Sequence, residues 1–163
     1  MKKVDFTGEV PRSVEDVYAA FTSAGFWSSY AQENHLSPPQ FDLTEENGGQ
    51  VTRMRSTVAV NQPQARSFIG DNAAVTATTR WSPRPAPYQG DLGVDVNAKA
   101  KADLAGTLRL EAAGEGSTRL TFNGTLNVRI PFVGGMVEGQ ALKYVPQAFD
   151  NLSRKLSSWQ PAA

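Results

Sequence analysis

The most unusual of the few residues that could do chemistry in this sequence is Glu138, within the stretch RIPFVGGMVEGQALKYV (129–145). At the helical step of 100° per residue from Met136, Glu138 falls on an apolar arc near Val145 and Leu156. A carboxylate there would orient a ligand or act as a general base. The alternative is a first-turn acid that complements the helix dipole, which the rarity of unpaired buried glutamate favours.

A second group of candidates consists of aromatic side chains with polar tips. Trp27 and Tyr30 either gate a pocket or fill the core, since small-molecule pockets are themselves lined by aromatic residues. Trp81 shares a strand face with apolar residues, and a buried Tyr144 would need a ligand or a strand carbonyl as partner for its hydroxyl. The sequence therefore predicts a ligand-binding set made of Trp27, Tyr30, Trp81, Phe122, Glu138, Ala141, Tyr144, Val145 and Phe149.

No motif for catalysis, metal binding or cofactor binding is present. The single histidine, His35, has no partner at ligand spacing, and the chain contains no cysteine. The GGMVEG stretch lacks the Lys and Ser/Thr of a phosphate-binding loop, and no nucleophile-elbow serine is visible. The sequence thus predicts no catalytic residue, no metal and no cofactor.

Length and charge restrict the class of protein further. The 163 residues suit one domain, predicted to span 1–163. Lys plus Arg equals Asp plus Glu at 16 each, so nothing favours a nucleic-acid partner. No segment has the roughly 18 apolar residues of a membrane span, and no signal-peptide run follows Met1. These features indicate a cytoplasmic protein and leave its oligomeric state open.

Hydrophobic periodicity predicts the elements that must position the candidates. A strand at 2–10 ends at Pro11, and Ser13 with Asp16 caps an amphipathic helix. A second short helix, FWSSYAQ, carries Trp27 and Tyr30. Period-2 alternation then predicts antiparallel strands at 41–60, as a hairpin turning at Gly48-Gly49, and at 74–82, 91–98, 103–111 and 118–130.

A long C-terminal helix over residues 135–159 is predicted to cover the apolar face of this sheet. Its apolar arc includes Val145, Phe149, Leu152 and Leu156, and Pro146 is expected to kink it. Leu120, Phe122, Leu126 and Val128 should face that helix from the last strand. Small residues on the inner faces, namely Ala77, Gly106, Gly124, Ala141 and Ala148, would leave volume between helix and sheet.

This order of elements resembles the helix-grip fold of the START and birch-pollen-allergen (SRPBCC) superfamily. The segments VDFTGEVPRSVEDVYAAFT, TRWSP, GTLRLE and IPFVGGMVEG are similar to an actinobacterial family of uncharacterised function. The resemblance implies an α+β fold, with a curved antiparallel sheet of about seven strands wrapped around the long C-terminal helix and two short helices after the first strand. It also implies a hydrophobic cavity between sheet and helix.

Two main functions compete, with a third behind them. A carrier or sensor of an apolar, lipid- or polyketide-like molecule needs only the cavity. A cyclase- or dehydratase-type enzyme needs convergent Arg, Tyr, His or carboxylate groups inside it. A count of polar cavity side chains discriminates between the two: none or one favours binding, and three or more that converge favour the enzyme. The mainly Val, Leu, Phe and Ala inner faces favour the carrier. Alternatively, Arg53, Arg55 and Arg80 on the outer sheet surface could serve a protein-interaction module.

Overall fold

The elements follow the predicted order of strand, helix pair, antiparallel strands and last helix. The computed structural model describes residues 2–59, 71–83, 87–98, 101–129 and 144–159. The elements are β1 (Lys2–Val10), α1 (Val14–Phe21), α2 (Ala24–Glu33), β2 (Gln40–Glu46), β3 (Gly49–Ala59), β4 (Asn72–Trp81), β5 (Tyr88–Asn97), β6 (Lys101–Gly114), β7 (Ser117–Arg129) and α5 (Tyr144–Ser158).

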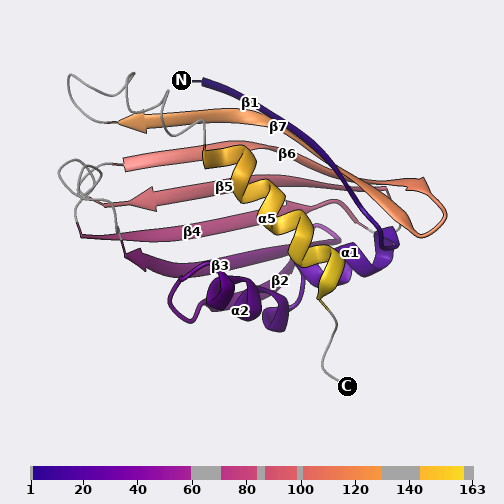
Figure 1. Cartoon of the computed structure of the whole chain (residues 1–163), viewed down its shortest axis with the longest axis horizontal. Helices are drawn as coiled ribbons and strands as arrows, with labels where there is room; N and C mark the ends of the chain where they lie inside the picture. The colour runs from indigo at the N-terminus through magenta and orange to yellow at the C-terminus, as the bar shows by residue number, and fades with distance from the viewer. Residues whose placement is uncertain (1, 60–70, 84–86, 99–100, 130–143, 160–163) are drawn as a thin grey trace.

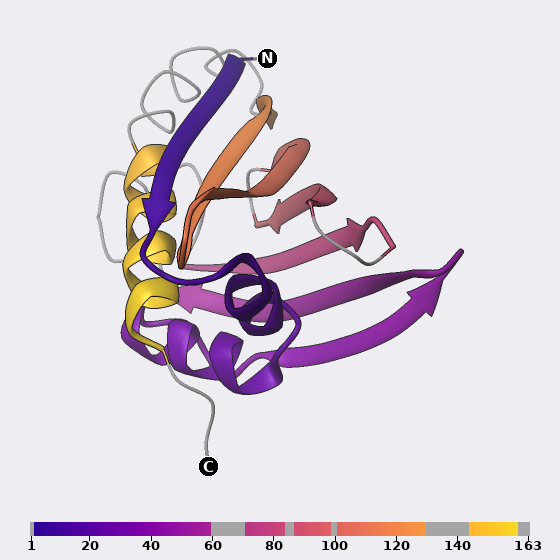
Figure 2. The ribbon, with the colours of Figure 1, turned by 90° about the vertical axis from the view of Figure 1, so that its right-hand side faces the viewer.

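The strands form one antiparallel sheet in the order β1-β7-β6-β5-β4-β3-β2 (Figure 1). Strands β2 to β7 pair with their neighbours along the chain, and β1 closes the other edge against β7, with Phe6 opposite Phe122. The sheet is strongly curved, and the helices lie on its concave side (Figure 2). This α+β arrangement is the predicted helix-grip fold.

Alternation along β7 places the predicted residues on the concave face. Leu120, Phe122, Leu126 and Val128 are buried, whereas Arg119, Asn123 and Arg129 between them are exposed. A strand with one apolar face must bury that face against another layer. The sequence prediction for this strand is therefore confirmed over Ser117–Arg129.

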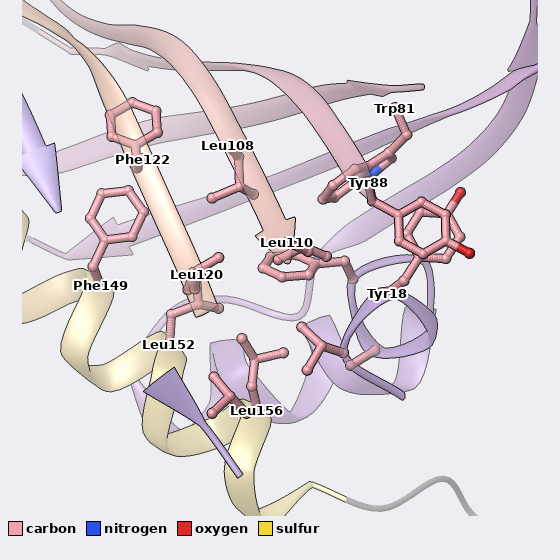
Figure 3. Packing of buried hydrophobic residues seen from close by; sticks show 14 of the residues in the cluster. Tyr18, Trp81, Tyr88, Leu108, Leu110, Leu120, Phe122, Phe149, Leu152 and Leu156 are labelled. Atoms are coloured by element: carbon pink, nitrogen blue, oxygen red, sulfur yellow. The ribbon is translucent and has the colours of Figure 1, made fainter. Parts of the chain in front are cut away.

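The apolar stripe of α5 supplies that second layer. Phe149 stacks on Phe6 of β1 and on Phe122 of β7, with both pairs of ring centroids 5.0 Å apart. Leu152 and Leu156 are buried one and two turns further along (Figure 3). At the end of the helix, the guanidinium of Arg12 donates to the carbonyls of Leu156 and Trp159. A cation here also complements the helix dipole.

Several local details refine the sequence predictions. The Ser13 hydroxyl accepts from the Asp16 N–H at 3.1 Å and caps α1 as expected. The β2–β3 turn is centred on Asn47-Gly48 rather than Gly48-Gly49, because both residues have the positive φ angles (53° and 81°) that a type I′ turn needs. Pro146 is the third described residue of α5, and the kink expected at this residue stays a prediction. The predicted helical residues 135–143 lie outside the described residues.

Glycines at the centre of β6 and β7 have a different role from the one predicted. Gly106 and Gly124 are directly opposite each other on the two strands. A Cβ on Gly106 would overlap the backbone of Asn123 and Gly124, and a Cβ on Gly124 would overlap the Ala105 carbonyl. Glycine is required where backbones approach so closely. Glycine at these two positions permits the close approach of β6 and β7, and neither residue is among those that line the cavity.

Truncation of Phe149 tests the packing of the last helix. Phe149→Ala should lower the free energy of unfolding by about 3–5 kcal/mol, the usual range for a buried phenylalanine. Leu43→Ala, at a side chain that is 45% exposed, should change it by less than about 0.5 kcal/mol. Chemical denaturation of both variants makes the measurement. Equal midpoints for Phe149→Ala and wild type, at equal slope, would contradict the packing of α5.

A pair of glycine substitutions tests the close approach of β6 and β7. Gly106→Ala should destabilise the protein by about 1–3 kcal/mol or more, because the added methyl group must displace backbone. Gly93 on β5 has open space around the position of a Cβ, so Gly93→Ala should be neutral or stabilising by up to about 1 kcal/mol. Thermal unfolding compares the two, and a Gly106→Ala protein as stable as Gly93→Ala would show that the close approach is unimportant.

Candidate functional site

A largely apolar cavity of about 280 Å³ lies between the concave face of the sheet, α2 and α5. Inward-pointing residues of four strands form its floor: Thr52, Met54, Val75, Ala77, Thr79, Leu92, Val94, Leu104 and Leu108. Trp27 and Tyr30 of α2 border it on one side, and Val145, Ala148, Phe149 and Leu152 of α5 border it on another. The volume is near the lower end of the range for small-molecule sites, about 300–1,000 Å³.

The position of α5 explains why the space is not filled. Phe149 anchors the helix to β1 and β7 at one side of the curved sheet. The floor strands β3, β4 and β5 curve away from that contact (Figure 2). Two of the lining positions, Ala77 on β4 and Ala148 on α5, carry short side chains. A straight helix docked at one side of a curved sheet therefore leaves volume above the other side.

Helix α2 covers this open side, and polar contacts connect it and the turn after it to α1, α5 and β3. The Trp27 indole N–H donates to the Phe21 carbonyl at 2.9 Å. Lys155 of α5 forms an ion pair with Glu33 at the end of α2, with Nζ and Oε1 2.9 Å apart. Just after α2, the Ser37 N–H donates to the Thr57 carbonyl of β3 at 2.9 Å. These contacts hold the ring of Tyr30 against the cavity.

The structure brings four of the predicted ligand-binding residues together. Trp27, Tyr30, Val145 and Phe149 all line the cavity. Phe122 is buried beneath Phe149. Trp81 packs in the core against Tyr18 and Phe21, with ring centroids 5.4 and 5.5 Å apart, and its indole nitrogen has no hydrogen-bond partner within the described residues.

The other three predicted site residues cannot be placed in the same way. Glu138 and Ala141 lie outside the described residues, as does the side chain of Tyr144. The roles of these residues remain predictions.

Sequence reasoning missed two polar residues on the cavity floor, Thr52 and Thr79. They are directly opposite each other on β3 and β4 and are only 6% and 7% exposed. The alternation that places Thr79 on the inner face with Trp81 was visible in the sequence. Which inner-face residues meet the helix and which meet empty space depends on where α5 docks, and periodicity does not contain that information.

Charged side chains are absent from the part of the lining that the structure describes. Three hydroxyl-bearing side chains, Tyr30, Thr52 and Thr79, are its principal polar groups, since the Trp27 N–H is already paired. Burial raises the pKa of Tyr30 above its ordinary value, so the phenol is neutral at physiological pH. The described lining thus contains three polar side chains, the number at which an enzyme would be considered. Threonine hydroxyls, however, do not ionise in the physiological range and cannot serve as acid or base there.

The outer surface carries the arginines considered for partner binding. Arg80 is exposed and forms an ion pair with Glu46, at 2.7 Å between Nη1 and Oε2, and Arg53 and Arg55 are also exposed.

His35 occupies the turn after α2 with a φ of 60°. Among the described residues, no three acidic, histidine or cysteine side chains cluster as a metal site. No described helix combines the length and the apolar character needed to cross a bilayer.

Strand order, sheet curvature and helix placement together define a protein with the helix-grip fold. The chain belongs to DUF2505, described as a family of proteins of unknown function, whose model matches residues 5–159. No protein of curated function matches the sequence.

Solved structures share the fold at low sequence identity. A protein from Thermus thermophilus, TTHA0849, is 17% identical with a TM-score of 0.68, covering 95% of this chain and 94% of its own. The Zhui aromatase/cyclase from Streptomyces sp. R1128 is 14% identical with a TM-score of 0.60, covering 96% and 91%. A START superfamily protein from Mycobacterium smegmatis is 20% identical with a TM-score of 0.58, covering 96% and 95%. At these identities the similarity establishes the fold alone.

Alkaline unfolding tests the burial of Tyr30. Because its folded-state pKa is raised above the ordinary 10.0, the folded protein holds the phenol proton more tightly than the unfolded chain does. This contribution to stability is complete below the unfolded-state pKa and is lost as pH rises through the folded-state pKa. Between about pH 9 and about pH 11, the wild type should therefore lose more unfolding free energy than Tyr30→Phe. Parallel stability curves for the two proteins would place the Tyr30 hydroxyl in water.

Proposed function

We propose that this domain, taken as a single unit over residues 1–163, binds an apolar small molecule of the lipid or polyketide class between the sheet and α5. The observation that carries the proposal is the cavity of about 280 Å³, which is lined almost entirely by aliphatic and aromatic side chains. An ordinary core is packed to near-crystal density, and a concave apolar site with a few polar groups is typical of small-molecule binding. The START-like fold of the solved structures above agrees with such a site.

Binding is better supported than catalysis by the described lining. A cyclase or dehydratase would need groups that exchange protons near neutral pH. Tyr30 is the one residue of the expected Arg, Tyr, His or carboxylate set in the described lining, and its raised pKa keeps it protonated. A cytoplasmic location and an actinobacterial origin stay predictions.

Filling the cavity tests the proposal directly. Ala77→Trp places a large ring on the cavity floor, so it should weaken binding of the neutral fluorescent probe N-phenyl-1-naphthylamine at least about tenfold, since steric exclusion removes the buried apolar contact. Ala74 is exposed on the opposite face of the same strand, so Ala74→Trp should bind the probe as the wild type does. Fluorescence titration gives the affinities, and circular dichroism verifies that both variants are folded.

Two results would count against cavity binding. If a folded Ala77→Trp protein bound the probe as tightly as Ala74→Trp, the probe would occupy another surface. If the wild type showed no saturable binding of this probe or of a varied set of other apolar compounds, the carrier interpretation would fail.

A further inference from the structure

Two threonines are the polar residues that the described sheet contributes to the cavity floor. Thr52 and Thr79 both line the cavity, and as residues they are more than nine-tenths buried. A threonine hydroxyl can donate one hydrogen bond, whereas valine, which has nearly the same shape, has no polar group to offer.

Their placement makes the two hydroxyls a single polar spot. Residues opposite each other in an antiparallel pair have Cβ atoms about 4.5–5.5 Å apart, and Thr52 and Thr79 form such a pair. The next inward-facing pair along the two strands is Met54 opposite Ala77, and the neighbour of Thr79 on β5 is Leu92. All three of these residues are apolar and line the cavity. The spot is therefore surrounded by hydrocarbon on the sheet.

The same lining disfavours a charged ligand. An ionised carboxylate transferred from water to an apolar site without a paired cation is strongly disfavoured. No described Lys or Arg lines the cavity. Lys155 of α5 is paired with Glu33, and Arg12 is bonded to the end of α5. A neutral oxygen, by contrast, needs one hydrogen-bond donor, and a threonine hydroxyl supplies one.

We infer that the ligand is uncharged and carries a carbonyl or hydroxyl oxygen, an inference that rests on the proposed function. This oxygen accepts a hydrogen bond from the Thr52–Thr79 pair, while hydrocarbon fills the rest of the cavity. Tyr30, whose phenol borders the same cavity, offers a second neutral donor. The pair thus determines specificity: it selects a ketone, ester or alcohol, and the described lining, which carries no charged side chain, rejects fatty acids and other carboxylates.

Three ligands of nearly equal shape test this on the wild-type protein. 2-Acetylnaphthalene is a neutral ketone, 2-naphthoate is its anionic counterpart at pH 7, and 2-isopropylnaphthalene lacks oxygen. Each competes with bound N-phenyl-1-naphthylamine in a fluorescence displacement assay. The ketone should bind at least about 100-fold more tightly than the carboxylate, because burial of the unpaired charge is so unfavourable. Equal affinity of the two would overturn the inference but leave apolar binding intact.

A second arm assigns the preference to the threonines. Thr52→Val with Thr79→Val should weaken ketone binding about 2- to 10-fold, the range for a neutral hydrogen bond, and leave the affinity for the hydrocarbon equal or higher. Thr52→Ser with Thr79→Ser keeps the hydroxyls and should retain the preference for the ketone. Thr57 and Thr78 point away from the cavity on the same strands, so the double valine variant at those two positions is the matched control.

The outcomes distinguish a failure of the threonine contact from a failure of apolar binding itself. If ketone and hydrocarbon lose affinity equally in the valine variant, the hydroxyls do not contact the ligand and the inference is wrong. If neither the probe nor any of the three ligands binds the wild type, the proposed function itself fails, and the inference fails with it.

Discussion

The docking of α5 centres on one aromatic cluster, in which Phe149 stacks on both Phe6 and Phe122. These residues come from the first strand, the last strand and the last helix, so the two ring contacts join both ends of the chain. It also fixes the lateral position of the helix on the sheet. Because α5 is held over β1 and β7, the concave face of β3, β4 and β5 is left for α2 and the cavity (Figure 2).

Curvature of the sheet is the second requirement for a cavity. A flat sheet would bring the floor strands up to the helix, and their side chains would fill the gap. At Gly106 and Gly124 the two strand backbones approach too closely for any Cβ. The absence of side chains there permits the close approach of β6 and β7. The cavity lies where the curved sheet is covered by α2 and the edge of α5.

The concave face has two regions that differ in how their polar side chains are used: the end that carries Tyr18 and Tyr88, and the cavity. At one end of the concave face, Tyr88 donates to Glu15 at 2.8 Å and Tyr18 donates to Gln50 at 2.5 Å, so the stacked tyrosine rings there have bonded hydroxyls. At the cavity, the polar residues of the described sheet lining are Thr52 and Thr79, and the rest of that sheet lining is apolar. A concave apolar surface with a few polar groups is typical of a small-molecule site.

The sequence by itself determined the elements, the inner face of β7 and the buried stripe of α5, and the resemblance of their order to a known superfamily implied the helix-grip fold. Period 2 and period 3.6 are local properties that Leu120, Phe122, Phe149 and Leu156 display directly. Only the tertiary structure decided that Trp27 and Tyr30 meet empty space whereas Trp81 and Phe122 are buried in the core, and that Thr52 is next to Thr79. These outcomes depend on strand register, sheet curvature and helix docking, which are set by contacts between residues far apart in the chain.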